Sequence, residues 1–367
     1  MLAPYVLAAV LGGVLVWLGS WALKPAPDPV SPDPLRSSFD DYAWVAQPEP
    51  AFPRPPHASY LEGLTIVIDP GHGGRADREG WKCGPTGLRE AEVNLRVAQF
   101  LRGFLAGSGV NVVLTREADV YLDADDQADL LARIAIANES RADLFLSIHH
   151  NAGRSAETNY TSVFYHGAPD HSPASLDVAR HLLAGLHDAL RLEQQLDCGL
   201  VSDYAIYPGK GFAVLRAAEV PAVLTESSFH SNPAEERRLR NPVYNRREAY
   251  GLFLGLARWA QAGLPTVRLI QPEDGRVKAG ETIIVALDDG LSRRGGFGLD
   301  LPQIRSDSLL VELDGQPLSH SVDLAQRQVR ITPTRAMVER GARLRVDFAN
   351  VFGQHVRHPW IELRPGD

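Results

Sequence analysis

Between residues 62 and 264, short apolar runs alternate with segments of helical periodicity, and this alternation restricts the possible folds more than any other feature. The run Thr65–Asp69 is rich in β-branched residues and predicts a buried strand. From Glu92 to Phe104, apolar residues recur at helical spacing. The same alternation continues to Gly263, which is typical of an α/β fold whose helices are layered on a sheet.

Polar residues that could bind a metal or transfer protons lie at the ends of the predicted elements. His72 comes three residues after the first strand, His149 and Glu226 directly follow later strands, and Glu90 opens the first helix. In open α/β sheets, ligands bind beyond the carboxyl ends of the strands, so parallel strands would bring all four residues to one rim. The remaining predicted strands are Asn111–Thr115, Asp143–Ile148 and Pro221–Thr225, and the remaining predicted helices are Leu130–Asn138, Ser175–Leu190, Pro233–Leu239 and Arg246–Ala260.

Two imidazoles and two carboxylates suit a catalytic zinc site. Such a site has three protein ligands and an open fourth position, and a separate carboxylate handles protons. Each residue also has an ordinary structural reading. A histidine after a strand can be a hydrogen-bonded turn residue, and Glu90 can be a carboxylate favoured by the helix dipole. His150 should point to the opposite face from His149, because side chains alternate along a strand.

Four sequence motifs resemble those of the zinc-dependent N-acetylmuramoyl-L-alanine amidases (type 3 catalytic domain). The motifs are Asp69–Gly74 (Asp-Pro-Gly-His-Gly-Gly), Gly87–Leu95, Ser147–Asn151 and Pro221–Asn232, with Leu114–Arg116 and Ala137–Asn138 similar to the family's spacers. The resemblance implies a mixed sheet with helices on both faces. It also implies hydrolysis of the amide between N-acetylmuramic acid and L-alanine in peptidoglycan.

Carried over residue by residue, the resemblance makes His72, Glu90 and His149 the Zn²⁺ ligands and Glu226 the catalytic acid/base. The chain departs from the family pattern in two loops. The Arg75–Pro85 loop is longer than usual, and extra residues rich in Asp lie between Asp119 and Arg133. Asn151–Ser175 looks too short for the long inserted helix that blocks the site in some relatives, so we expect an open site.

The N-terminal segment, residues 1–24, is predicted to be a membrane anchor or a signal peptide. Leu2–Leu23 carries no charge and, at about 1.5 Å per residue, is long enough as a helix to span a bilayer. Ser20–Ala22 would serve as a cleavage site for a signal peptide, but the length of the run favours an uncleaved anchor. The inferred substrate places the body in the cell envelope, on the periplasmic or extracellular side.

Residues 25–61 are predicted to be an extended linker. Ten prolines fall between Pro25 and Pro56, and proline resists both helix and sheet. Such a tether would let an anchored enzyme reach peptidoglycan at a distance from the inner membrane. The catalytic domain is then expected at residues 62–264.

Residues 265–367 are predicted to be a small all-β sandwich that resembles bacterial immunoglobulin-like modules. Helical periodicity stops at Thr266, and short strands follow with turns such as Asp314-Gly315 between them. Its partner is not readable from the sequence. The predicted strands are Val267–Ile270, Thr282–Leu287, Leu309–Leu313, Gln328–Ile331 and Leu344–Phe348.

Composition excludes some alternatives and leaves others open. From Arg268 onward basic and acidic residues balance, so the net charge of −8 falls on the first 267 residues. Nucleic acid is therefore not an expected partner. Cys83 and Cys198 are too few for a cysteine-rich zinc site, and either a disulfide or two free thiols fits the sequence.

Two other functions compete with the zinc amidase. One is a cysteine amidase or peptidase that uses Cys83. The other is a non-catalytic peptidoglycan-binding protein with a decayed amidase fold.

Overall fold

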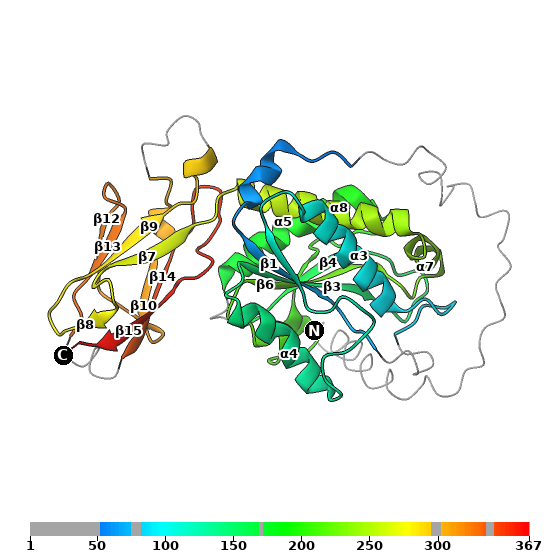
Figure 1. The fold of residues 1–367 in the computed structure, drawn as a ribbon, viewed down its shortest axis with the longest axis horizontal. Coiled ribbons are helices and arrows are strands. Elements are labelled where there is room, and N and C mark those ends of the chain that lie inside the picture. The colour runs from blue at the N-terminus through cyan, green and yellow to red at the C-terminus, as the bar shows by residue number, and fades with distance from the viewer. Residues whose placement is uncertain (1–51, 75–81, 169–171, 295–301, 335–340, 367) are drawn as a thin grey trace, which may run out of the picture. The chain divides into compact units, whose positions relative to one another are not determined.

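The computed structural model describes residues 52–74, 82–168, 172–294, 302–334 and 341–366. Within these ranges the chain forms two compact units (Figure 1). The first contains residues 63–171 and 179–255, together with residues 52–55. The second contains residues 56–62, 172–178 and 256–367. The segment 1–24, predicted to be an anchor or signal peptide, lies outside the described residues.

The first unit is built on a six-stranded mixed sheet with the strand order β2-β1-β3-β6-β4-β5. Strands β2, β1, β3 and β6 run parallel, β4 pairs antiparallel with β6, and β5 pairs parallel with β4. The predicted α/β class is therefore confirmed. The strands are β1 (Thr65–Pro70), β2 (Asn111–Leu114), β3 (Leu144–Asn151), β4 (Ser162–Tyr165), β5 (Leu200–Ser202) and β6 (Ala222–Phe229).

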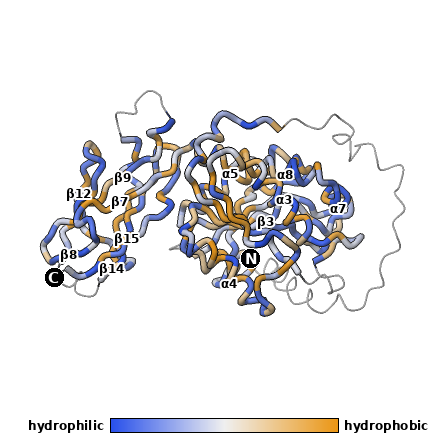
Figure 2. Tube along the Cα trace, viewed as in Figure 1, coloured by the Kyte–Doolittle hydropathy of each residue, from blue (hydrophilic) through white to orange (hydrophobic). Residues whose placement is uncertain are grey.

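Apolar strand residues alternate between the two faces of the sheet and bury both. Val67, Phe145 and Leu224 belong to one hydrophobic cluster, which also contains helical residues such as Ile134. Their neighbours Ile66, Ile68 and Leu146 are fully buried as well. Figure 2 shows β3 and the strands around it in the orange of hydrophobic residues. Burial on both faces is typical of a parallel sheet covered by helices.

Helices cover both faces of this sheet, with α4 on one side and α5 and α8 on the other (Figure 1). The α-helices are α3 (Glu90–Leu105), α4 (Asp126–Glu139), α5 (Pro173–Leu190), α6 (Ala213–Arg216), α7 (Pro233–Leu239) and α8 (Pro242–Gln261), and η3 (Asp203–Ala205) is a 3-10 helix. Every predicted helix exists, but four of the five begin two or four residues earlier than predicted. The Asp125 side chain accepts hydrogen bonds from two backbone N–H groups of the first turn and starts α4 at Asp126, four residues before the predicted start.

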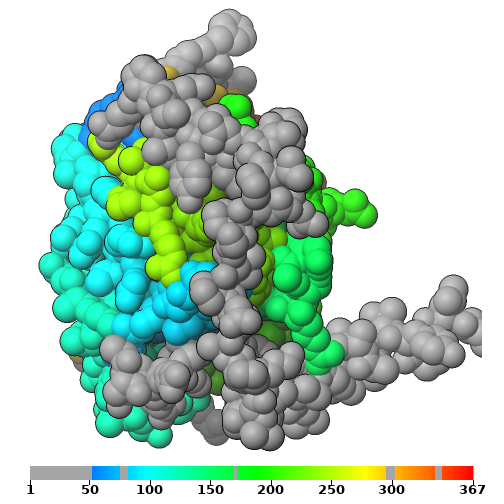
Figure 3. Space-filling model, turned by 90° about the vertical axis from the view of Figure 1, so that its right-hand side faces the viewer, coloured from blue at the N-terminus to red at the C-terminus, as the bar shows by residue number. Residues whose placement is uncertain are grey.

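The last part of the predicted linker is folded, which corrects the expectation of an extended tether to residue 61. Residues Pro56–Leu61 form the 3-10 helix η2, in which Ala58 and Leu61 are fully buried. Phe52 also contacts the rings of Phe104 and Tyr250. Aromatic packing of this kind outweighs the extended preference of the prolines. Phe104 belongs to α3 and Tyr250 to α8, and Figure 3 shows these two helices (cyan and yellow-green) side by side on one face of the first unit.

The second unit contains two sheets that share one hydrophobic core. Its five-stranded sheet has the order β11-β10-β14-β15-β8 and its four-stranded sheet the order β12-β13-β9-β7. Val285 of β9 and Leu344 of β14 both belong to the shared core. The strands are β7 (Thr266–Gln271), β8 (Arg276–Val277), β9 (Ile283–Asp288), β10 (Leu310–Leu313), β11 (Gln316–Pro317), β12 (Ser321–Asp323), β13 (Gln328–Ile331), β14 (Ala342–Asp347) and β15 (Trp360–Pro365), with the 3-10 helices η4 (Ser292–Arg294) and η5 (Ser306–Ser308).

The five strands predicted for this all-β region are all present, and β8, β11, β12 and β15 were missed. The first three are only two or three residues long, too short for an alternating pattern to appear. In the part of the chain that the structure describes, no helix combines the length and the apolar composition that a bilayer crossing requires.

Candidate metal centre

The four sequence-predicted residues lie together at the carboxyl edge of the parallel strands. His72 follows β1, His149 lies near the end of β3, and Glu90 is the first residue of α3. Glu226 on β6 is the register partner of His149. The three strands run parallel, so their ends meet at one edge, as the sequence predicts.

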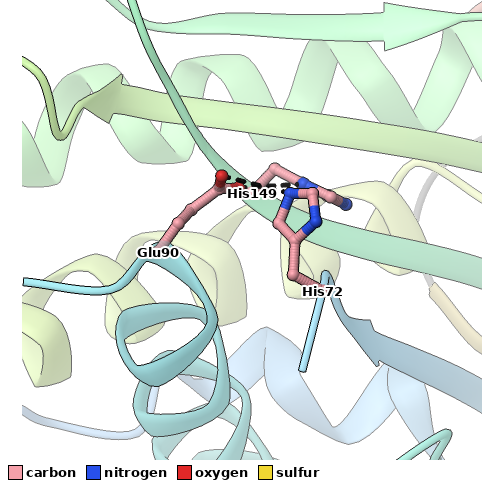
Figure 4. Close-up of side chains that lie close together, drawn as sticks. All are labelled: His72, Glu90 and His149. Atoms are coloured by element: carbon pink, nitrogen blue, oxygen red, sulfur yellow. Dashed lines mark hydrogen bonds and ion pairs between the residues drawn. The ribbon is translucent and has the colours of Figure 1, made fainter. Parts of the chain in front are cut away.

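Two imidazoles and one carboxylate point toward one another, as Figure 4 shows. The His72 Nε2 atom lies 3.1 Å from Glu90 Oε2, and His149 Nδ1 lies 3.0 Å from Glu90 Oε1. The two imidazole rings meet edge to face, with centroids 4.8 Å apart. One ligand atom from each residue lies within 4.8 Å of the other two, the only group of three such donors found among the described residues.

This donor set fits a divalent zinc ion. Zinc accepts imidazole nitrogen and carboxylate oxygen, and three protein ligands leave a coordination position for a reactant. Glu90 is only 2% exposed, whereas the side chains of His72 and His149 are 24% and 15% exposed. The carboxylate is therefore held inside the protein, while the two imidazoles are largely buried but each keeps a small part of its ring in contact with solvent.

The loop that carries His72 has an unusual backbone. His72 has a φ of 59°, in the left-handed region that residues other than glycine rarely adopt. Gly73 and Gly74 follow, also with positive φ values. The buried Arg133 guanidinium donates to the carbonyl oxygens of His72 at 2.8 Å and Pro70 at 3.1 Å. These bonds hold the loop in a conformation that the chain alone would not favour.

Gly71 makes room for the second imidazole. A Cβ atom at this position would lie 2.1 Å from the Nε2 atom of His149. Only glycine therefore allows the His149 ring to lie against the loop with its Nδ1 atom toward Glu90. This gives a physical reason for the Pro-Gly-His order of the first motif.

A second buried arginine ties the histidine loop to the helix that carries Glu90. Arg116 donates to the carbonyl oxygens of Pro70 at 2.7 Å, Gly71 at 3.0 Å and Ala91 at 2.8 Å. The residues before His72 and the first turn of α3 are thus joined through one guanidinium. Arg116 and Arg133 were not predicted as site residues, and Arg116 lies in a spacer motif that the sequence marked.

The protonation states favour cation binding. Burial lowers the pKa of His72 to about 4 despite the nearby Glu90 carboxylate, so the imidazole is neutral at pH 7, the form that binds a metal. Burial alone would raise the pKa of Glu90. The neighbouring His72 and His149 instead hold it well below its usual range, and the carboxylate is ionised.

The pKa of Glu226 is shifted in the opposite direction from that of Glu90. Burial, together with the negative charge of Glu90, raises the pKa of Glu226 well above its usual value, although Lys82 opposes the shift. Its Oε2 atom is buried and has no hydrogen-bond partner among the described residues. A carboxyl group with a raised pKa beside a metal centre suits general acid/base chemistry.

A third imidazole near Glu90, that of His230, was missed by the sequence reasoning. It is 2% exposed, and its Nε2 atom lies 3.7 Å from Glu90 Oε2. Neither ring nitrogen has a hydrogen-bond partner within the described ranges. Burial lowers the pKa of His230 to about 4. The signal that could have revealed it is its place in the fourth motif, directly after the strand that carries Glu226.

Cys83 and Cys198, both described by the structure, do not form a disulfide. Burial raises the pKa of the Cys83 thiol, which reduces the share of the reactive thiolate at neutral pH. The local environment thus does not favour Cys83 as a nucleophile.

Comparisons with known proteins identify a family. The sequence profile described as N-acetylmuramoyl-L-alanine amidase matches residues 66–258, more than half of the chain. All four predicted site residues lie within the matched segment.

Individual relatives carry the same description. The N-acetylmuramoyl-L-alanine amidase AmiC of Escherichia coli O6:H1 is 28% identical over 283 residues, which cover 67% of this chain and 66% of that protein. AmiC of Neisseria meningitidis serogroup B is 30% identical over 225 residues, which cover 53% of this chain and 52% of that protein. The solved structure of amidase AmiC2 of Nostoc punctiforme matches 54% of this chain and 97% of its own, with 26% identity and a TM-score of 0.45.

Proposed function

Because the chain belongs to the N-acetylmuramoyl-L-alanine amidase family, we propose that it hydrolyses the amide bond between N-acetylmuramic acid and L-alanine in peptidoglycan. The observation that carries this proposal is the convergence of His72, Glu90 and His149, whose ligand atoms all lie within 4.8 Å of one another. Two histidines and a glutamate form the donor set of a metal-dependent hydrolase. Beside them lies a second glutamate, Glu226, whose Oε2 atom has no hydrogen-bond partner among the described residues.

The side chains divide the chemistry between them. His72, Glu90 and His149 hold Zn²⁺, which when bound supplies Lewis acidity at the scissile carbonyl and the attacking water. Glu226 accepts the proton of the attacking water and later gives it to the departing L-alanine nitrogen. The raised pKa of the Glu226 carboxyl group favours its holding the proton between these two steps.

The remaining segments of the chain are consistent with a protein that acts in the cell envelope. We propose that residues 1–24 anchor the protein in the inner membrane or direct its secretion, so that residues 62–264 meet peptidoglycan on the periplasmic or extracellular side. The two sheets of the second unit, which share one core, support the proposal that residues 265–367 form an immunoglobulin-like sandwich.

The experiment that tests the function uses purified protein and cell-wall sacculi, with and without a chelator. Mass spectrometry should show released stem peptides that begin with L-alanine, and the chelator should suppress their release until zinc is restored. Binding of sacculi without release would instead indicate a decayed amidase fold. Release that survives the chelator but is lost in Cys83→Ala would indicate a cysteine enzyme.

A further inference from the structure

A chain of buried polar side chains lies behind the metal centre, on the opposite face of β3 from His149. The side chains of His150 and Glu248 are both fully buried, and His150 Nε2 lies 3.1 Å from Glu248 Oε2. The other ring nitrogen, Nδ1, lies 2.8 Å from the Oδ1 atom of Asn94. As the alternation of side chains predicted, His150 does not join His149 at the metal centre.

Asn94 contacts the ligand Glu90 and also the loop that carries the ligand His72. It lies one helical turn after Glu90, and its Nδ2 atom donates to Glu90 Oε1 at 3.3 Å. The same amide nitrogen donates to the carbonyl oxygen of Gly71 at 3.1 Å, in the loop that carries His72. Glu90 Oε1 also accepts the backbone N–H of His150 at 3.2 Å. Asn94 thus joins helix α3 to the histidine loop.

His150 on one side and the two acceptors Glu90 Oε1 and Gly71 O on the other together fix which way the Asn94 amide points. The Oδ1 atom of Asn94 can only accept, so the His150 Nδ1 atom must carry a hydrogen. This holds whether the pair is an imidazolium with a carboxylate or a neutral imidazole with a protonated Glu248. With Oδ1 engaged by His150, the amide NH₂ group must face Glu90 and Gly71.

We propose that Glu248, His150 and Asn94 are positioning residues that hold Glu90 and the His72 loop in the geometry that binds zinc. This inference rests on the proposed function, because it takes His72, Glu90 and His149 as the metal ligands. Partners that orient the ligands of a metal are a general requirement of such sites, and their loss costs about 10–100-fold in metal affinity or activity.

Stability does not account for the His150–Glu248 pair. The Oε1 atom of Glu248 is buried and has no hydrogen-bond partner in the part of the chain that the structure describes. Replacing a buried ionic pair by apolar residues of similar volume is often neutral or stabilising. A buried pair is therefore weak evidence for a stabilising role, and its contact with Asn94, which touches the metal ligand Glu90, points to a role in the site.

The test is a zinc titration of the full chain against a competing chromophoric chelator. The double variant His150→Leu/Glu248→Leu should bind zinc about 10–100-fold more weakly than the parent, while the chelator-treated protein stays folded and still unfolds cooperatively. The visible spectrum of the cobalt-loaded double variant should also change, because the spectrum reports the ligand geometry directly.

The isosteric variant Glu248→Gln should keep the parent affinity. The glutamine NH₂ group can donate to His150 Nε2, which leaves a hydrogen on Nδ1 for Asn94. The matched control is His166→Leu, which breaks another buried histidine–carboxylate pair, with Asp203 at 2.9 Å. Because β4 runs antiparallel to β6, His166 lies toward the other end of the sheet, and this variant should lose stability but keep its zinc affinity.

Unchanged zinc affinity in the folded double variant would overturn the inference. If the double variant does not fold, Glu248→Leu replaces it, and equal affinities of Glu248→Leu and Glu248→Gln would overturn the inference instead. A parent protein that binds no zinc would contradict the proposed function itself. The titration uses no peptidoglycan, so a parent that binds zinc but releases no stem peptides leaves this inference standing.

Discussion

Glu226 lies beside the ligand set but is not part of it. It is the register partner of His149 across β3 and β6, and His72, Glu90 and His149 already complete the donor group. Its pKa is raised, and its buried Oε2 atom has no hydrogen-bond partner among the residues that the structure describes, which is costly for a buried polar group. The proposed function therefore assigns metal binding and proton transfer to different side chains.

Replacing Glu226 by Gln should keep zinc bound and slow hydrolysis about 10²–10⁴-fold, because an amide of the same shape cannot transfer the proton. Zinc content is measured by elemental analysis, and hydrolysis by stem peptide release from sacculi. Replacing His72 by Ala is the comparison, since it should lower both quantities. A Glu226→Gln protein that retains zinc and cleaves at nearly the parent rate would refute the role assigned to Glu226.

Asp69 is a buried residue near the end of β1, just before the loop that carries His72. Its ionisation should make the free energy of unfolding depend on pH. It accepts hydrogen bonds from Thr115, Ser147 and Arg133 at 2.6–2.9 Å. Burial would raise the pKa of Asp69, but Arg133 and the two hydroxyl groups hold it below the ordinary value of 3.8. Its contribution to stability is therefore present above pH 3.8 and is lost as the pH falls through the lowered folded value.

The variant Asp69→Asn should lose about 3 kcal/mol of unfolding free energy at pH 7, because Arg133 loses a buried anionic partner. The difference from the parent should shrink as the pH falls below 3.8. Urea denaturation at pH 7 and at pH 3 or below measures both effects. A difference that stays constant across this range would show that Asp69 is not the titrating group.

At the scale of elements, helices α5 and α8 approach each other so closely that their backbones nearly touch. A Cβ atom on Gly185 would lie 2.2 Å from the carbonyl oxygen of Gly251, and a Cβ atom on Gly251 would lie 2.6 Å from that of Gly185. Backbone atoms cannot move aside as a flexible side chain can. The close crossing on this face of the sheet therefore depends on glycine in both helices.

The variant Gly251→Ala should lower stability by about 1–3 kcal/mol, since the added methyl group forces the two helices apart. The matched control is Gly103→Ala in α3, where a Cβ atom would meet nothing within 4 Å. That change should stabilise the protein by about 0.5–1 kcal/mol, the usual advantage of alanine in a helix. Thermal unfolding of both variants separates the two effects, and a stabilised Gly251→Ala protein would show that the helices can separate without cost.

At the scale of the whole molecule, the boundary predicted at residues 264 and 265 does not coincide with the way contacts group the chain. Residues 172–178 and 256–264 belong to the same compact unit as the β-rich segment. The backbone N–H and the Nδ1 atom of His355 lie 2.6 and 2.9 Å from the Asp177 carboxylate. Asn350 donates to the carbonyl oxygen of Ala262 at 2.9 Å. The β-rich segment thus supports residues at the start of α5 and after α8.

A chain that ends at Leu264 should therefore be less stable than the full chain, by at least about 1–3 kcal/mol for the lost partners of Asp177. Chemical denaturation of both forms measures the difference. The variant His355→Ala in the full chain should reproduce part of the loss. If the shortened chain were as stable as the full one, residue 264 would be a true domain limit.

The sequence by itself determined the α/β class and the all-β region, and it proposed the four residues of the candidate site. Strand and helix periodicities are local, and residues 65–69 or 92–104 display them without reference to the rest of the chain. The positions of His72, His149 and Glu226 after strands, together with the motifs around them, were enough to place these residues at one edge of the sheet. Element starts such as that of α4 were less predictable, because capping by Asp125 overrode the apolar pattern.

Only the tertiary structure decided how the site is supported. Glu248 lies 98 residues from His150, and Arg116 lies 45 residues from Gly71, so no local pattern connects them. The short strands β4 and β5, the packing of Phe52 and the burial of His230 against Glu90 likewise arise from contacts between distant segments. Local periodicity records which face of an element is apolar, whereas the partners of a buried polar group are known only once the elements have packed together.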